Sequence, residues 1–283
     1  MKRGPKIRVA TCQFAVSGNV RRNGRQIRRQ ITAAKGLGAD LVHFPEVALS
    51  GYAATDFPNW DGYDWSALRS ETEAILALAA RRKVWVVFGS SHPLSGRHLP
   101  HNSLYVVNPR GRLVARYDKR FCTDGDLRFY SPGDHFATFD VKGVRCGLLV
   151  CYDMRFPELY REYKKRGVQL MLHSFYNARA GGAGIHTIIM PATLQARAAT
   201  NYMWISANNS SGYYQSWSSL FVLPDGSIEG RLRRHRAGLA VFTVDRSRSY
   251  YDAAGGYRDR AMRGILHSGR LVADPRSRRR KAL

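Results

Sequence analysis

The chain has 283 residues, of which 44% are hydrophobic, and 45 Lys and Arg residues against 21 Asp and Glu residues give a formal net charge of +24. This length suits two domains or one large α/β domain, and the apolar content is sufficient for a sizeable core. No apolar run approaches the roughly 20 residues that a membrane span needs. The N-terminal sequence MKRGPKIRVATCQFA also lacks the long apolar stretch of a signal peptide. We therefore expect a cytoplasmic protein that is neither secreted nor inserted in a membrane.

Short β-rich runs alternate with helical patterns along the chain. Turn residues at Pro109 and Gly111, and at Asp225 and Gly226, predict two hairpins. Apolar strands bracketed by helices indicate a covered sheet, and hairpins indicate antiparallel neighbours, so we predict an α/β fold whose sheet is not purely parallel. Strands are expected at residues 7–15, 40–44, 84–92, 103–108, 113–118, 145–151, 168–174, 202–209, 218–223 and 239–245, and helices at 19–36, 66–82, 157–166 and 187–201.

The C-terminal segment differs from the rest of the chain. From Arg270 onwards, the sequence RLVADPRSRRRKAL loses apolar periodicity and is rich in arginine. We predict one folded domain over residues 1–268 and a basic tail over residues 269–283, which is either solvated or a docking arm.

The positive charge has two interpretations. Such an excess attracts polyanions, acidic protein partners or anionic substrates. Alternatively, the arginines only solvate helix faces. In NVRRNGRQIRRQITAAKG, Val20, Ile27 and Ile31 share one helical face and the arginines lie elsewhere, which is ordinary amphipathicity. Both interpretations stay open for the chain as a whole.

The four cysteines are Cys12, Cys122, Cys146 and Cys151. None shows CxxC spacing or a zinc-type pairing with histidines, so neither a redox motif nor a structural metal site is indicated. A chain with its own core does not need disulfides, and we expect free thiols in a reducing compartment.

Three charged or nucleophilic residues stand at the ends of predicted strands. Cys151 ends the apolar run GLLVC and precedes a predicted helix, where backbone N–H groups can face a developing oxyanion. Glu46 follows DLVHF, and Lys119 ends LVARYD. The histidines offer no recognisable base, and the GxSxG motif of α/β-hydrolases is missing around Cys151.

The stretches FPEVALSGY, YDKRF and VCYDMRFPELYR resemble the Glu-Lys-Cys signatures of the nitrilase superfamily of carbon–nitrogen hydrolases. KIRVATCQFAVSGNV, LHSFYNA and QARAATNYMWISANNSS resemble other segments of that family, so the resemblance covers residues 6–245 in the family order. It implies a four-layer αββα sandwich, assembly into homodimers or larger homo-oligomers, and no metal or organic cofactor. The hydrolase domain would then be the predicted domain over residues 1–268.

The resemblance also implies the catalytic roles. Cys151 would attack the substrate carbon and form a thioester, and Glu46 would take the thiol proton, pass it to the departing amine and then activate water. Lys119 and the backbone N–H of Tyr152 would hold the oxyanion. Asp153 and Arg155 are expected to fix the turn and the helix start.

One family position departs from the pattern. Many members carry a second glutamate eight residues before the aspartate of a PGD motif, and in DLRFYSPGD that position is Asp126. Its side chain is shorter by one methylene, a retreat of about 1.5 Å, when a misplacement near 1 Å can cost about 100-fold in rate. Either the loop compensates or the role is altered, and Asp124 is a rival for the same position.

The segment CYDMRFPELYR resembles the amidase and carbamoylase branches, whereas true nitrilases typically carry Trp-Glu after the cysteine. We therefore expect hydrolysis of a linear amide or an N-carbamoyl amide. The high charge suggests an anionic small molecule, or one presented by an acidic carrier protein, as substrate. Residues expected to contact the substrate are Tyr52, Tyr152, His173, Tyr176 and Asn177, with His186 as a further candidate.

Two other classes of function stay open. An N-acyltransferase would use the same thioester and pass the acyl group to an amine. A catalytically silent protein that binds nucleic acid or an acidic partner would explain the charge. The intact set of Glu46, Lys119 and Cys151 and the lack of RRM, KH or zinc-finger motifs argue against nucleic-acid binding.

Overall fold

The computed structural model describes residues 6–177 and 184–281. The chain divides into two compact units, Met1–Asp252 and Ala253–Leu283. The second unit contains two short helices, α5 (Arg258–Met262) and α6 (Pro275–Arg278), within the part of it that the structure describes. The last residue of the LHSFYNA segment and residues 282–283 of the predicted tail lie outside the described residues. The tail boundary at residue 269 stays a prediction.

The first unit contains two mixed sheets of six strands each. In the first sheet, β1, β2 and β3 run parallel, while β4, β5 and β12 pair antiparallel with their neighbours. The strand order is β12-β1-β2-β3-β4-β5. The bounds are β1 (Lys6–Gln13), β2 (Leu41–His43), β3 (Trp85–His92), β4 (His101–Val107), β5 (Leu113–Asp118) and β12 (Gly238–Asp245).

The second sheet repeats this plan with later segments of the chain. Strands β7, β8 and β9 run parallel in its centre, and the outer strands pair antiparallel. The order is β11-β10-β9-β8-β7-β6. The bounds are β6 (Thr138–Val141), β7 (Val144–Val150), β8 (Leu170–Ser174), β9 (Trp204–Asn208), β10 (Leu220–Val222) and β11 (Ile228–Arg231).

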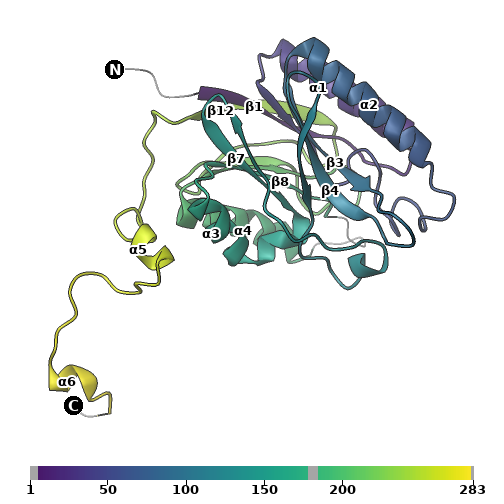
Figure 1. Ribbon diagram of the computed structural model, residues 1–283. Coiled ribbons are helices and arrows are strands. Elements are labelled where there is room, and N and C mark those ends of the chain that lie inside the picture. Colours follow the sequence, from purple (N-terminus) through teal and green to yellow (C-terminus); the bar gives the residue numbers. More distant parts are fainter. Residues whose placement is uncertain (1–5, 178–183, 282–283) are drawn as a thin grey trace. The chain divides into compact units, whose positions relative to one another are not determined.

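Apolar faces of the two sheets meet in a common core, and helices cover their outer faces (Figure 1). Helices α1 (Val20–Gly36) and α2 (Trp65–Arg82) cover the first sheet, and α3 (Pro157–Lys165) and α4 (His186–Asn201) cover the second. This arrangement confirms the predicted αββα sandwich. Among the described residues, no helix is both long enough and apolar enough to cross a membrane.

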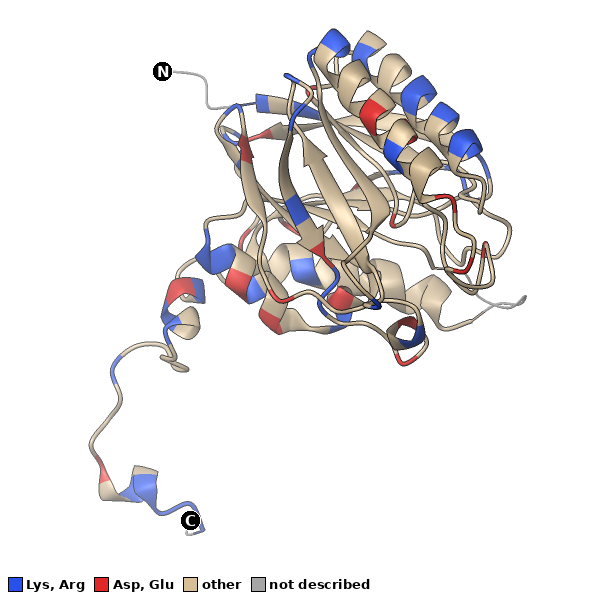
Figure 2. Ribbon diagram, turned by 45° about the vertical axis from the view of Figure 1, so that its right-hand side comes forward, with Lys and Arg blue, Asp and Glu red and all other residues tan. Residues whose placement is uncertain are grey.

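Helix α1 shows how the sequence sets one of these layers. Asn19 caps its N-terminus by accepting from the backbone N–H of Arg22 over 2.9 Å, and Val20, Ile27 and Ile31 are buried against the sheet. The expected amphipathicity is therefore confirmed. Lys and Arg residues recur along the helices of this outer layer (Figure 2).

The structure also shows elements that the sequence pattern did not predict. Strand β6 has only four residues with alternating burial, so its apolar signal is too short to stand out. The first predicted strand ends at Gln13 rather than at residue 15, because the carbonyl of Phe14 accepts from the N–H of Ser211 over 3.0 Å instead of joining the sheet ladder. All four cysteines are free thiols.

Candidate active site

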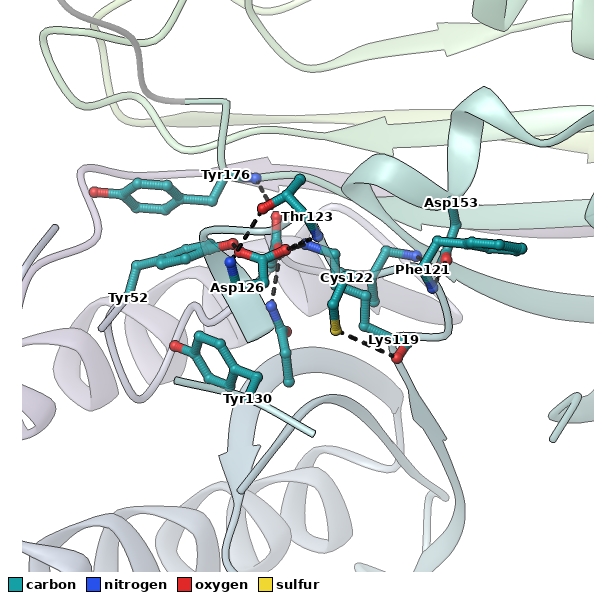
Figure 3. A network of polar contacts seen from close by, with 12 residues as sticks. Tyr52, Lys119, Phe121, Cys122, Thr123, Asp126, Tyr130, Asp153 and Tyr176 are labelled. Atoms are coloured by element: carbon teal, nitrogen blue, oxygen red, sulfur yellow. Dashed lines mark hydrogen bonds and ion pairs between the residues drawn. The ribbon is translucent and has the colours of Figure 1, made fainter. Parts of the chain in front are cut away.

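Three buried charged side chains meet at the strand ends of the first sheet. Glu46 lies three residues beyond β2, Lys119 directly follows β5, and Asp126 opens a short 3-10 helix, Asp126–Arg128. The ammonium of Lys119 donates to Glu46 Oε1 over 3.0 Å. It also donates to Asp126 Oδ2 over 2.8 Å, and Figure 3 shows Lys119 beside Asp126. The side chains of Lys119 and Glu46 are 1% and 0% exposed, so water barely screens these ion pairs.

Glu46 is held by two further donors. The side-chain amide of Asn102 donates to Oε1 over 2.7 Å, and the backbone N–H of Tyr176 donates to Oε2 over 2.7 Å. Burial raises the pKa of Glu46 above its ordinary value, although the Lys119 charge opposes the rise. A carboxylate that is fixed in place and has a raised pKa is suited to general-base work near neutral pH.

Lys119 stays charged in this setting. Burial on its own would lower the pKa of Lys119, but the carboxylate charges of Glu46 and Asp126 raise it well above the ordinary value. The site therefore contains a permanent cation within electrostatic reach of the Cys151 thiol.

The structure explains how the shorter Asp126 reaches Lys119. Only residues 120–125 separate the two in sequence, and the backbone N–H of Thr123 donates to Asp126 Oδ2 over 3.0 Å. The hydroxyl of Tyr52 donates to the other oxygen, Oδ1, over 2.5 Å. Burial would raise the pKa of Asp126, but the Lys119 charge and these hydrogen bonds hold it below its ordinary value. Asp126 thus contacts Lys119 despite its shorter side chain, while the rival Asp124 is exposed.

Cys151 directly follows β7 and opens the 3-10 helix Cys151–Arg155. Its φ of 42° lies in the left-handed region that non-glycine residues rarely adopt. The turn is fixed by Asp153, which accepts from the N–H of Val150 over 3.0 Å, the N–H of Phe121 over 2.9 Å and the hydroxyl of Tyr117 over 2.8 Å. Asp153 thus fixes the turn, as expected, and also joins it to the segment that follows Lys119.

The Cys151 thiol is neutral at rest. Burial, followed by the nearby Glu46 carboxylate, raises its pKa, while Lys119 and the backbone N–H of Tyr176 favour the thiolate. Burial also raises the pKa of Asp153, to about 6. A neutral thiol needs a base, and Glu46 is within electrostatic reach of it.

A cavity of about 290 Å³ opens above these groups. Most residues expected to contact substrate lie in its wall, and so do two arginines and Met190 that the sequence reasoning did not place there. The lining includes Tyr52, Lys119, Asp126, Arg128, Cys151, Tyr152, Arg155, Tyr176, Asn177, His186 and Met190.

His173 lies behind the nucleophile and is not among the described residues of the cavity wall. Its Nδ1 is 2.6 Å from the hydroxyl of Tyr160 on α3, and its ring stacks on Phe175 with 4.2 Å between centroids. Because side chains alternate along β8, His173 faces the α3 layer while Ser174 faces the other sheet. Substrate contact by His173 stays a prediction that its position does not support.

Two residues of the site were not predicted from the sequence, namely Arg155 in the cavity wall and Asn102 beside Glu46. Arg155 was expected only to fix a helix start, yet it lines the cavity, and its guanidinium is 3.4 Å from Nδ1 of His186. Asn102 lies in β4, the strand that pairs with β5, and the N–H of Lys119 donates to its carbonyl over 2.8 Å. The hairpin at Pro109 and Gly111 was the available signal for Asn102.

In the part of the chain that the structure describes, no group of three or more His, Cys, Asp or Glu residues is placed to hold a metal ion.

Two packed mixed sheets, with a glutamate, a lysine and a cysteine gathered at their strand ends, place the molecule among αββα proteins with a Glu-Lys-Cys site. The chain belongs to the carbon-nitrogen hydrolase family, whose model matches residues 8–252. This confirms the resemblance that the sequence motifs indicated.

Individual relatives agree with that assignment. The chain is 30% identical to omega-amidase NIT2 of Homo sapiens over 78% of this chain and 83% of that protein. Nitrilase homolog 2 of Dictyostelium discoideum is 27% identical over 82% of this chain and 73% of that protein. An amidase of the nitrilase superfamily from Nesterenkonia AN1 has the same fold, with a TM-score of 0.76 and 24% identity over 93% of this chain and 98% of that chain.

Proposed function

We propose that this protein is an amidase that cleaves the C–N bond of a linear amide or N-carbamoyl compound through a thioester on Cys151. The observation that carries the proposal is the Lys119 ammonium, held 3.0 Å from Glu46 and 2.8 Å from Asp126 in the wall of a cavity that also contains the Cys151 thiol. Base, cation and nucleophile are the three groups that acyl transfer requires.

In the first half-reaction, Sγ of Cys151 attacks the carbonyl carbon and Glu46 takes the thiol proton. The oxyanion that forms accepts hydrogen bonds from Lys119 and from the backbone N–H of Tyr152. The C–N bond then breaks, Glu46 gives its proton to the departing nitrogen, and ammonia or an amine leaves. The acyl group remains on sulfur as a thioester.

In the second half-reaction, water attacks the thioester carbon and Glu46 takes a proton from it. The C–S bond breaks, the thiolate regains the proton, and the carboxylic acid departs. Burial raises the pKa of both Glu46 and Cys151. Each of the two groups that exchange the proton therefore favours its neutral form.

Relatives support amide chemistry. The name omega-amidase belongs to several proteins that match this chain, including those of Homo sapiens and Xenopus laevis. A glutamate-to-leucine mutant of the Nesterenkonia amidase shows covalent addition of the acetamide moiety of fluoroacetamide at its active-site cysteine. We infer the same nucleophilic role for Cys151.

The cavity wall supports an anionic substrate. Arg128 and Arg155 both line it, and neither forms an ion pair with a carboxylate of the described residues. Lys119, by contrast, already neutralises two carboxylates. Two guanidinium groups at the wall are suited to binding a carboxylate at the far end of an amide substrate. The side-chain carbonyl of Asn177 is buried and has no partner among the described residues, so it can accept from the substrate N–H₂ group.

The test is ammonia release from matched pairs of primary amides, one with a terminal carboxylate and one neutral, together with N-carbamoyl amino acids. We expect the carboxylate-bearing member to be preferred, Arg155→Gln to remove most of that preference, and Cys151→Ala to release no ammonia. Equal turnover of both members, unaffected by Arg155→Gln, would contradict the anionic substrate. Ammonia release that persists in Cys151→Ala would contradict the thioester.

The remaining expectations are also proposals. We infer a homo-oligomer, and its support is that Ile185 and Ile188 at the start of α4 are 67% and 71% exposed. Light scattering of the purified protein tests this. A cytoplasmic location and presentation of the substrate by an acidic carrier protein rest on sequence composition alone.

A further inference from the structure

Asp56 lies just behind the cavity wall, in the turn that follows Tyr52. Its backbone N–H donates to the carbonyl of Tyr52 over 2.8 Å, and the N–H of Tyr52 donates back to Asp56 Oδ2 over 2.9 Å. The second carboxylate oxygen, Oδ1, accepts from the hydroxyl of Tyr176 over 2.8 Å. Asp56 is half-buried and is not among the described residues that line the cavity.

The two tyrosines that Asp56 holds reach opposite sides of the catalytic site. The hydroxyl of Tyr52 donates to Asp126, while the backbone N–H of Tyr176 donates to Glu46 and faces the Cys151 thiol. The two tyrosine rings pack together with 5.1 Å between their centroids. One carboxylate therefore links a residue after β2 in the first sheet to a residue after β8 in the second.

We propose that Asp56 is a positioning residue that sets the placement of Glu46 and Asp126 around Lys119 through Tyr176 and Tyr52. This inference rests on the proposed amidase function and adds a residue that does not itself touch substrate. The Asp56 bridge denotes Asp56 with its hydrogen bonds to Tyr52 and Tyr176.

The electrostatic setting of Asp56 supports a positioning role over a role in an ion pair. No Lys or Arg side chain of the described residues forms an ion pair with it. Burial raises its pKa, and only hydrogen bonds from Tyr52 and Tyr176 oppose that rise. A half-buried carboxylate without a cation is costly unless its hydrogen bonds are needed.

The chemistry of the two donors allows a sharp test. In Asp56→Asn, the amide oxygen can accept from the Tyr52 N–H, and the amide N–H₂ can donate to the Tyr176 hydroxyl, which can turn to accept. Asn therefore keeps both contacts without the charge, whereas Ala loses both. Tyr176→Phe removes one contact and leaves the backbone N–H that binds Glu46.

The experiment compares Asp56→Ala, Asp56→Asn, Tyr176→Phe and the double variant Asp56→Ala/Tyr176→Phe. The readouts are kcat and KM for ammonia release, the rate of Cys151 alkylation by iodoacetamide followed by peptide mass spectrometry, and thermal unfolding. Asp64→Ala is the control, because Asp64 caps α2 through the N–H of Ala67 at 2.8 Å and lies away from the catalytic groups. Its loss should lower the melting temperature, because the helix loses its N-terminal cap.

We expect Asp56→Ala to lower kcat by about 10- to 100-fold with KM changed by less than about 3-fold, since the loss is one of geometry. Alkylation of Cys151 should slow as well. Asp56→Asn should stay within about 3-fold of the native protein, and the double variant should resemble Asp56→Ala because both changes break the same bridge. Asp64→Ala should be less stable and fully active.

Native kcat and alkylation in Asp56→Ala would overturn the proposal. So would equal losses in Asp56→Ala and Asp64→Ala, because the effect would then follow stability. A loss in Asp56→Asn as large as in Asp56→Ala would show that the charge matters and not the position. If the native protein hydrolyses no amide, the amidase proposal fails, and the alkylation rates still decide whether Asp56 positions the site.

Discussion

Two polar networks lie along and just beyond the same strands, and they differ in charge. The catalytic centre comprises Glu46, Lys119, Asp126 and Cys151, and its members are charged or become charged during the proposed reaction. The second network, which we call the central polar layer, lies between the two sheets. It comprises Thr11, His43, Ser174, Ser206 and Asn208, all fully buried.

The central polar layer is neutral and satisfied. His43 places Nε2 2.8 Å from the hydroxyl of Ser174 and Nδ1 3.0 Å from that of Ser206. Ser174 donates to the carbonyl of Phe44 over 2.8 Å, so it accepts from His43, which carries its proton on Nε2. Burial lowers the pKa of His43 to about 3. His43 ends β2, three residues before Glu46, and Ser174 ends β8, two residues before Tyr176.

The difference teaches how this fold separates stability from reactivity. Inside the sheets, hydrogen bonds join β2, β8 and β9 without charge and fix their relative position. A few residues further along the same strands, Glu46 and Tyr176 leave the ladder and meet charged groups. We therefore expect changes in the catalytic centre to affect turnover, and changes in the central polar layer to affect unfolding.

The largest effect is expected for Glu46→Gln. The variant keeps the shape but cannot take the thiol proton, so kcat/KM for amide hydrolysis should fall by about 10³-fold. The melting temperature should fall modestly, because the new N–H₂ group must face a donor that the carboxylate accepted from, while Lys119 keeps its ion pair with Asp126. Steady-state kinetics beside a thermal scan checks this, and a variant that unfolds early while keeping its activity would break the comparison.

Asp126→Glu is expected to cost about 10- to 100-fold in kcat/KM, although it restores the residue that many relatives carry. The short loop after Lys119 already brings the aspartate to 2.8 Å, and an added methylene displaces the carboxylate. Kinetics of this variant beside Asp124→Glu, which changes an exposed carboxylate, provides the measurement. Native activity in Asp126→Glu would show that the loop does not set the distance.

His43→Gln should cost about 2 kcal/mol of unfolding free energy above pH 6.5, since a buried hydroxyl loses its partner. Folded His43 binds a proton only near pH 3, whereas the unfolded chain binds it below 6.5. Native stability from this group is therefore complete above pH 6.5 and falls by about 1.4 kcal/mol per pH unit below it. Denaturant titrations should show the gap between native and variant closing in acid. A gap that stays constant with pH would contradict the assignment.

The smallest effect concerns salt. If the arginines attract an anionic substrate, kcat/KM for a carboxylate-bearing amide should fall severalfold between low salt and about 0.5 M salt, and that for a neutral amide should not. Initial rates across a salt series test this, and identical behaviour of both amides would remove electrostatic steering.

Much of the site could be predicted because its main residues stand at strand ends. Glu46, Lys119 and Cys151 follow apolar runs, and three ordered motifs around them indicated both the family and the sandwich. Residues that depend on pairing details were harder to find. Asn102 lies near Glu46 because β4 pairs with β3, in the register that sets Asn102 opposite Ser91.

Asp56 was beyond the reach of the sequence for a related reason. The Asp56 carboxylate accepts a hydrogen bond from the Tyr176 hydroxyl. Tyr176 follows a strand of the other sheet and is 120 residues away in sequence. Arg155 was assigned to the helix start, because the pattern around a nucleophile does not show which charged side chains turn toward the cavity. Such tertiary contacts leave no local periodicity to detect.

The most direct test of the central claim is mass spectrometry of the native protein quenched during turnover of an amide substrate. A mass increase equal to the acyl group, mapped to the peptide that contains Cys151 and removed by hydroxylamine, is the predicted result. An adduct on Cys122, which follows Lys119 closely in sequence, or amide turnover that persists in Cys151→Ala, would contradict it.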